Sequence, residues 1–91
     1  EAAAEGPTAS VALYHLALRD LAQGDPDAAE RRLAEVQARN PTIERIAQLR
    51  ALAHCQAGRS TEATRLGAPW LSGAAGPRAD RAFWEWLRDR C

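Results

Sequence analysis

Two stretches of the chain, 34 residues apart, constrain the fold more than any other feature. The first reads LAQGDPDAAERRL, at positions 21–33, and the second reads CQAGRSTEATRLG, at positions 55–67. Gly24 of the first stretch aligns with Gly58 of the second. Glycine adopts the left-handed backbone conformation that ends many helices without steric cost, so each glycine predicts a turn between two helices. The offset therefore predicts a helix-turn-helix unit that occurs twice.

The composition also favours an all-α fold. Alanine accounts for 21 of the 91 residues, and it has the highest helix propensity of all residues. Val, Ile, Phe and Tyr, which favour strands, are few. A chain of this length forms one small domain. We therefore expect a single all-α domain of about five antiparallel helices with short connections.

Capping residues and helix breakers predict where these helices begin and end. The expected ranges are 9–23, 26–39, 43–57, a short helix from 60 to a point between 66 and 71, and 79–90. The expected N-terminal caps, whose short polar side chains can accept from a free backbone N–H group, are Thr8 or Ser10, Asp25, Thr42 and Ser60. Residues 1–8 are expected to form a linker or a disordered end, and residues 72–77 a loop.

The charges balance and are interspersed along the chain. There are 12 arginines, no lysine and 12 acidic residues, so the formal net charge is zero. A nucleic-acid-binding surface would show a basic excess, so we expect no nucleic-acid partner. No long apolar run occurs, so we expect no membrane insertion, and a cytoplasmic location is preferred over the alternatives that stay open. Ion pairs are expected along one face of the helix 26–39, among Asp27, Arg31, Glu35 and Arg39.

The first unit, residues 10–43, resembles the tetratricopeptide repeat, a helix-turn-helix unit whose period is also about 34 residues. The matching positions are Leu13 in the tryptophan slot of that motif, Leu16-Ala17 in its Leu-Gly slot, Ala29 and Leu33 four residues apart, and Pro41 at the close. Asp20 departs from the motif, because an aromatic residue is usual at that position. The small residues at these slots let neighbouring helices approach closely.

The second unit, residues 44–77, is a degenerate match to the same motif. The positions that stay in register are Ala51, His54 and Ala63. The positions that depart are Ala47 and Gly67, where the motif has large apolar residues, and Pro77, which lies two residues late. With the helix 79–90 as a C-terminal cap, the resemblance implies one tetratricopeptide-like domain over residues 9–91. An unrelated small helical bundle is the alternative.

The resemblance implies a binding groove, because the first helix of each tetratricopeptide unit lines the concave face of such folds. The residues that it would place there are Val11, Tyr14, Leu18, Leu21, Leu52 and Trp86. The alternative is that this apolar stripe packs as core, against an upstream domain or against a second copy. Since the chain has no lysine, an anion in the groove would have to be held by Arg45 or another arginine, unless these are ordinary surface residues.

Helical spacing also suggests how the other apolar residues pack. Leu13, Leu16 and Ala17 are expected to face the second helix. The capping helix is expected to bury a stripe of Phe83, Trp86 and Leu87. Trp84 and Trp86 cannot share one face of a helix, so one of them is expected inside and the other outside. Trp70 is expected to fold back into a second small cluster.

Chemistry is not expected from this chain. His54 and Cys55 are adjacent on a helix and point in different directions, so they cannot readily form a nucleophile–base pair. Two histidines and two cysteines at no recognised metal spacing predict no metal site, and we expect no cofactor. Cys55 and Cys91 are expected at the same end of neighbouring helices. Free thiols are the preferred prediction, and a disulfide requires Cα atoms within about 7 Å.

The sequence therefore predicts a protein that is not an enzyme. It would be an interaction module that binds a helical or extended protein segment, either of another protein or of an upstream part of its own chain. One alternative comes from GRSTEATRLGAPWL followed by AFWEW, which is similar to the tetratricopeptide-like chaperones of type III secretion needle subunits. Such a chaperone shields a small helical client. A second alternative is a C-terminal assembly or dimerisation module of a larger bacterial protein, with a possible homodimer.

Overall fold

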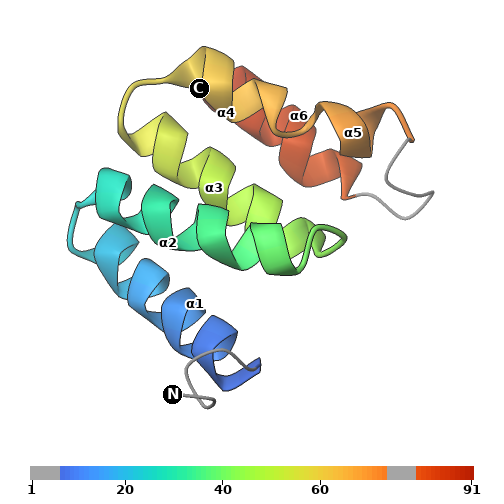
Figure 1. Ribbon diagram of the computed structural model, residues 1–91. Helices are drawn as coiled ribbons and strands as arrows, with labels where there is room; N and C mark the ends of the chain where they lie inside the picture. The colour runs from blue at the N-terminus through green and yellow to red at the C-terminus, as the bar shows by residue number, and fades with distance from the viewer. Residues whose placement is uncertain (1–6, 74–79) are drawn as a thin grey trace.

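The computed structural model describes residues 7–73 and 80–91, and every regular element in these ranges is an α-helix (Figure 1). The helices are α1 (Pro7–Ala22), α2 (Pro26–Arg39), α3 (Glu44–Gln56), α4 (Ser60–Arg65), α5 (Ala68–Leu71) and α6 (Arg81–Arg90). Helices α1 to α4 pack in chain order, each against the next, and α6 packs against α3, α4 and α5. The prediction of an all-α fold built from antiparallel helices is confirmed.

The turns after α1 and α3 are alike, as the 34-residue offset predicts. Gly24 has φ of +79° and Gly58 has φ of +82°, both in the left-handed region that favours glycine. The N–H group of Asp25 donates to the carbonyl oxygen of Asp20 at 2.8 Å, and that of Arg59 donates to the oxygen of His54 at 2.8 Å. These pairs are related by the same offset. Each turn therefore closes its helix with the same backbone hydrogen bond.

Two helix starts carry a side-chain cap. Asp25, the predicted cap of α2, accepts from the backbone N–H of Ala28 at 3.3 Å. Asp80 accepts from the N–H of Phe83 at 3.1 Å and fixes the start of α6, two residues after the predicted one. Both carboxylates lie where the helix dipole favours negative charge.

The remaining predicted caps are wrong. Helix α1 begins at Pro7, and proline fits the first helical position because its missing N–H group would be unpaired there anyway. The rest of the predicted linker, residues 1–6, lies outside the described part of the chain. Ile43 and Arg59 occupy the N-cap positions of α3 and α4 and make no side-chain capping bond. The displaced candidates are Thr8, Ser10, Thr42 and Ser60.

The predicted fourth helix is divided at Gly67 into α4 and α5. A Cβ atom at this position would lie 2.5 Å from Cε3 of Trp84, closer than van der Waals contact allows. Glycine fits here because the indole of Trp84 occupies the space that a side chain would need. Of the predicted loop 72–77, residues 72 and 73 form a turn, and residues 74–77 lie outside the described ranges.

The core has two parts. The first core joins α1, α2 and α3, and its buried members are Ala17, Ala29, Leu33, Val36, Ile46, Leu49 and Ala53. The second core joins α3 to α6, and its buried members are Ala47, Ala51, Ala63, Trp70, Trp84 and Leu87. Leu52 packs against both. The repeat-related alanines Ala17, Ala29, Ala51 and Ala63 expose no surface, as close helix packing requires.

Two apolar residues lie on faces that the sequence did not predict. Leu16 does not face α2 but is 38% exposed, whereas Ala17 on the same turn is fully buried. On α6, Trp84 and Leu87 are buried and Trp86 is 46% exposed. The predicted buried stripe is therefore wrong in one position, because it contained Trp86 instead of Trp84. The expectation that one tryptophan of the pair points inward and the other outward is confirmed.

The departure from the repeat motif at Asp20 has a structural reason. This side chain is buried, and its carboxylate forms an ion pair with Arg32 of α2 at 2.8 Å. A charged pair therefore joins the two helices of the first unit at this position. Because breaking such a pair leaves a charge in a partly dry site, Asp20 and Arg32 stabilise the packing of α1 on α2 only together.

Cys55 and Cys91 form a disulfide, so the prediction of free thiols is wrong. Their Cα atoms are 5.7 Å apart, within the range that a disulfide requires. The C-terminal end of α6 lies beside the C-terminal end of α3, which brings the last residue of the chain to Cys55 (Figure 1). The bond ties α6 covalently to α3 across a sequence separation of 36 residues.

Candidate functional site: a groove between α1 and α3

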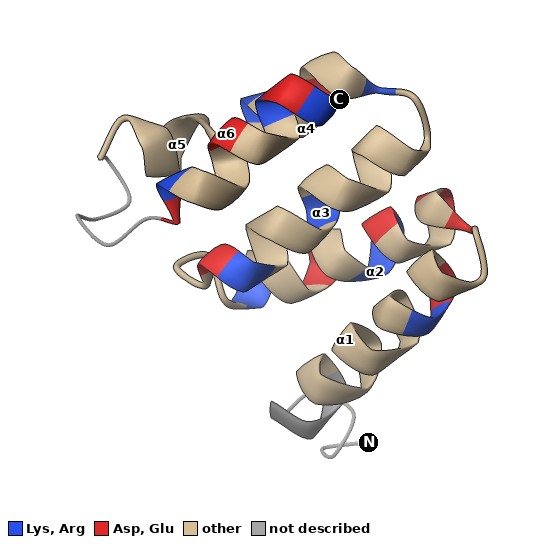
Figure 2. Cartoon of the chain, turned by 180° about the vertical axis from the view of Figure 1, so that it is seen from behind, with Lys and Arg blue, Asp and Glu red and all other residues tan. Residues whose placement is uncertain are grey.

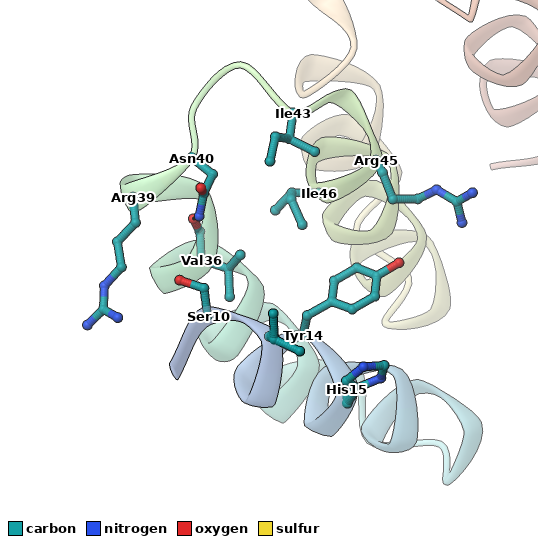
Figure 3. Close-up of a pocket in the computed structure, with 10 residues that line it drawn as sticks. Ser10, Tyr14, His15, Val36, Arg39, Asn40, Ile43, Arg45 and Ile46 are labelled. Carbon is teal, nitrogen blue, oxygen red and sulfur yellow. The ribbon is translucent and has the colours of Figure 1, made fainter. Parts of the chain in front are cut away.

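A groove opens between the first half of α1, the C-terminal end of α2 and the start of α3 (Figure 3). Its volume is about 1120 Å³, and it is open to solvent. The lining residues are Ser10, Val11, Tyr14 and His15 from α1, Val36, Arg39 and Asn40 from α2 and its C-cap, and Ile43, Arg45 and Ile46 from the start of α3.

The floor of the groove is apolar and belongs to the first core. Val36 and Ile46 are buried members of that core, and Tyr14 packs against it. Figure 3 shows the ring of Tyr14 reaching from α1 toward α3. Above this floor, Val11 is 54% exposed and Ile43 is 44% exposed. The groove therefore offers a continuous apolar surface whose upper part is in contact with water.

The turn between α2 and α3 builds one end of the groove. Asn40 ends α2, and its side-chain amide donates to the carbonyl oxygen of Val36 at 3.0 Å. The N–H group of Ile43 then donates to the carbonyl oxygen of Asn40 at 3.3 Å. These two bonds hold the turn closed, so that Ile43 stands at the mouth of the groove as α3 begins.

The charged residues of the lining are all basic. Arg39 and Arg45 lie on opposite sides of the groove, and no aspartate or glutamate lines it (Figure 3). Arg39 forms an exposed ion pair with Glu35 at 3.2 Å, whereas Arg45 makes no hydrogen bond or ion pair within the described residues. Figure 2 shows that no Lys, Arg, Asp or Glu marks the described part of α1 before its C-terminal half. The groove therefore has an excess of positive charge in a chain that is neutral overall.

The six residues predicted to bind a partner do not form one surface. Val11 and Tyr14 line the groove. Leu18, Leu21 and Leu52 are half-buried and pack against the first core of this domain itself. The sixth, the exposed tryptophan of α6, is not part of the lining.

Sequence reasoning missed the contributions of Ile43, Ile46 and Val36. Ile43 and Ile46 follow the Asn-Pro breaker at a spacing of three, which places both on one side of the helix start. An isoleucine in the N-cap position is a usable signal, because a short polar residue is normal there. The helix that these residues face depends on the path of the turn between α2 and α3. That path cannot be predicted from the sequence pattern.

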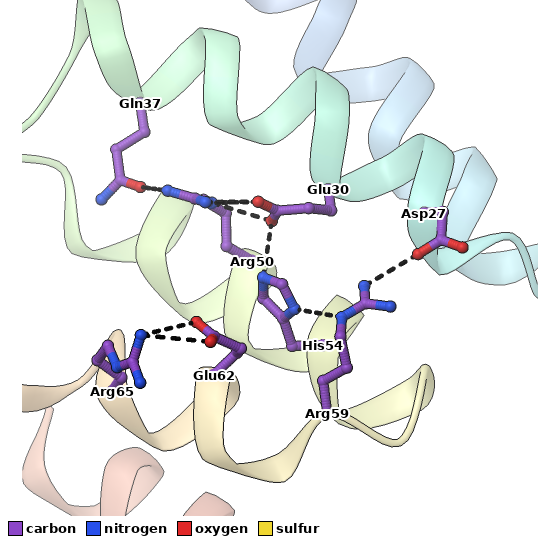
Figure 4. Close-up of polar contacts among 8 residues, drawn as sticks. All are labelled: Asp27, Glu30, Gln37, Arg50, His54, Arg59, Glu62 and Arg65. Carbon is purple, nitrogen blue, oxygen red and sulfur yellow. Dashed lines mark hydrogen bonds and ion pairs between the residues drawn. The ribbon is translucent and has the colours of Figure 1, made fainter.

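A polar network connects α2 to α3 (Figure 4). Arg50 forms an ion pair with Glu30 and donates to the side-chain oxygen of Gln37 at 2.7 Å. Nε2 of His54 lies 3.4 Å from Oε1 of Glu30, and Nδ1 of His54 accepts from Arg59 at 2.8 Å. These partly buried contacts fix the angle between α2 and α3, and so the position of the α3 side of the groove.

The ion pairs predicted along α2 form only in part. Arg39 pairs with Glu35 at a spacing of four, as predicted. Asp27 instead pairs with Arg59 at the start of α4, at 2.9 Å, and thus joins the network of Figure 4. The side chain of Asp27 therefore points toward the turn between α3 and α4 and not along α2.

The His54–Cys55 pair carries no free thiol, because Cys55 is in the disulfide. Both ring nitrogens of His54 face protein groups. Within residues 7–73 and 80–91, no three His, Cys, Asp or Glu side chains are grouped so that they could hold a metal ion. No helix in these ranges is long and apolar enough to span a bilayer.

Comparisons of the chain with models of protein families, with curated proteins and with solved structures find no match. A proposal for the function of this chain therefore rests on the groove and the residues around it.

Proposed function

We propose that the chain is a non-enzymatic, tetratricopeptide-like interaction module that binds a helical or extended segment of another protein in the groove between α1 and α3. One observation carries this proposal. Four large apolar side chains are exposed among the described residues, and two of them, Val11 and Ile43, line the same groove. Full burial of a valine or isoleucine side chain contributes about 1.5–3 kcal/mol, so covering both favours binding.

The repeated turn geometry supports the same proposal. Helices α1 and α3 are the first helices of the two repeat-related units, and the groove lies between them. In tetratricopeptide folds this is the side on which partner segments bind. The disulfide and the network around Arg50 hold α3 in place, so the groove has one wall that is fixed before a partner arrives. Such preorganisation lowers the entropic cost of binding.

The test is selection of binders from random 16-residue peptides displayed on phage, with the purified chain immobilised. Selected peptides are then made synthetically and titrated against the ¹⁵N-labelled chain, with amide shifts followed by NMR. We expect the largest shifts in the first half of α1 and at the start of α3. Shifts confined to α6, or no peptide that binds, would refute a groove function.

Two substitutions on the exposed part of α1 make the test specific. Val11→Asp places a charge in the groove, and it should weaken peptide binding by at least about tenfold, since a buried unpaired carboxylate is costly. Leu16→Asp is the matched control, because Leu16 is exposed on the same helix but does not line the groove. Both variants should keep the helical circular-dichroism spectrum of the parent chain.

Leu16 also favours a second candidate function, an assembly interface on the outer face of α1. An exposed leucine at the end of a helical array is a surface that a neighbouring domain or a second copy can cover. Light scattering over a concentration series separates the two candidates. A dimer that Leu16→Asp dissociates and Val11→Asp leaves intact would assign self-association to the outer face of α1, and would leave the groove free for a peptide.

A further inference from the structure

From the charges around the groove we infer that its occupant is an acidic polypeptide segment, in which apolar residues cover the floor and a side-chain carboxylate binds Arg45. This inference rests on the proposed function, because it names the chemistry of the segment that the groove takes. It goes further in two ways. It assigns Arg45 as the anchoring residue, and it predicts the sign of the partner's charge.

Charge segregation is the first argument. The whole chain has 12 basic and 12 acidic residues, yet the lining of the groove holds two arginines and no acidic residue. An apolar segment that enters the groove displaces water from the neighbourhood of these arginines. Removing water from a charge costs free energy unless a counter-charge replaces it, so the best partner brings carboxylates to the rim.

The surroundings of Arg45 are the second argument. The neighbouring carboxylate of Glu44 is already engaged elsewhere, since it accepts from the indole N–H of Trp84 at 2.7 Å and from the backbone N–H of Asp80 at 2.8 Å. The guanidinium of Arg45 thus has no acidic partner among the residues that the structure describes. Its planar fork of donors suits a carboxylate, which it can bind with two parallel hydrogen bonds.

Arg39 has a different role on the opposite side of the groove. Its exposed pair with Glu35 neutralises much of its charge, so it contributes less to anion binding than Arg45 does. The N-terminal end of α3 adds positive electrostatic potential to that of Arg45. No side chain caps this helix, and the positive end of its dipole lies beside Ile43 in the groove.

The experiment uses the full chain and the same displayed library of random 16-residue peptides, fused at their C-termini so that only side-chain carboxylates are available. We expect the selected peptides to be enriched in Asp and Glu next to apolar residues. Arg45→Gln should weaken a fluorescein-labelled selected peptide by about fivefold to tenfold, the range of a charge-assisted pair at a partly shielded site. Replacing the Glu of the peptide by Gln should lower its affinity for the parent chain by the same factor. The same replacement should not lower its affinity for the Arg45→Gln variant any further.

Arg31→Gln is the matched control. Arg31 is exposed on α2, outside the lining, and its substitution changes the net charge by the same amount. Equal weakening by both substitutions would overturn the assignment of Arg45, because it would reveal only long-range attraction between opposite net charges.

The remaining outcomes separate this inference from the proposed function. Peptides that bind in the groove without enrichment in acidic residues, and without sensitivity to Arg45→Gln, would overturn the inference and leave the proposed function standing. A library that returns no peptide sensitive to Val11→Asp would overturn both. A dimer that buries Arg45 against a second copy of the chain would also overturn the inference, since the occupant would then be this chain.

Discussion

Reduction of the Cys55–Cys91 disulfide should destabilise the domain by about 4 kcal/mol. The bond closes a loop with a sequence separation of 36 residues. In the chain-entropy model, a loop of this length removes about 13 cal/mol/K of entropy from the unfolded chain, which corresponds to about 4 kcal/mol at 25 °C. A domain of this size has a total stability of roughly 5–14 kcal/mol, so the bond supplies a large share of it.

Urea unfolding with and without reductant measures this contribution directly. Fluorescence follows the second core, because Trp70 and Trp84 are buried there, and circular dichroism at 222 nm follows all the helices. We expect the midpoint to fall on reduction, and the melting temperature to fall by roughly 15–30 °C. Cys91→Ala removes the bond and only one sulfur atom from the packing, because Cys91 is partly buried against the second core.

Cys91→Ala should therefore unfold at the same urea concentration as the reduced parent chain, and reductant should not affect it further. If reduction leaves the midpoint of the parent chain unchanged, the bond does not form in solution, and the reasoning is refuted. If reduction lowers the midpoint but Cys91→Ala in oxidising buffer does not, then the loss of stability on reduction does not come from the loss of the covalent link.

Three further substitutions test the packing in urea titrations. Gly67→Ala should cost about 1–3 kcal/mol, because its Cβ would lie 2.5 Å from a ring carbon of Trp84, and combining it with Trp84→Leu should recover part of this loss. Glu30→Ala should cost about 1–3 kcal/mol because it leaves Arg50 without its carboxylate, and the loss should be smaller in 1 M salt, which weakens the ion pair of the parent chain; a loss below about 0.5 kcal/mol in low salt would contradict a role for this pair. Trp86→Ala should change stability by less than about 0.5 kcal/mol, whereas Trp84→Ala should cost about 3–5 kcal/mol, and the reverse order would show that α6 is rotated relative to its position here.

The features that the sequence predicts well are those that depend on neighbouring residues. The turns at Gly24 and Gly58 follow from the backbone freedom of glycine, and the cap at Asp25 follows from a side chain that bonds three residues ahead. The buried alanines of the repeat are equally local, since helical spacing places them on one face. These residues define an all-α chain with a repeated turn, and the structure confirms both.

The features that the sequence predicts poorly depend on contacts between distant segments. On α6, helical spacing permits either Trp84 or Trp86 to join Leu87, and the choice is made by the space beside Gly67, far away along the chain. The disulfide likewise requires the end of α6 to return to Cys55. Helix propensity and periodicity contain no information about either of these long-range contacts. The predicted stripe of α6 and the predicted free thiols are therefore both wrong.

The candidate site follows the same division. Val11 and Tyr14 were predicted from the apolar stripe of the first helix and do line the groove, whereas Leu18 and Leu21 on the same stripe pack against the core. The stripe is thus divided along its length, because α1 diverges from α3 toward its N-terminal end while its C-terminal end stays close (Figure 1). Gln56 donates to the carbonyl oxygen of Leu21 at 3.3 Å at that closed end.

This divergence connects the stability of the molecule to its proposed function. The second core is tied by a disulfide, and the polar network around Arg50 holds α2 on α3, whereas α1 is held on α2 by apolar packing and the Asp20–Arg32 ion pair. The disulfide and the network around Arg50 therefore both lie on the α3 side of the groove. In the proposed binding mode, small movements of α1 on its apolar contacts would adjust the groove to the bulk of an incoming segment, while Arg45 on α3 would keep its position. Shape tolerance would then come from α1, and charge selectivity would come from α3.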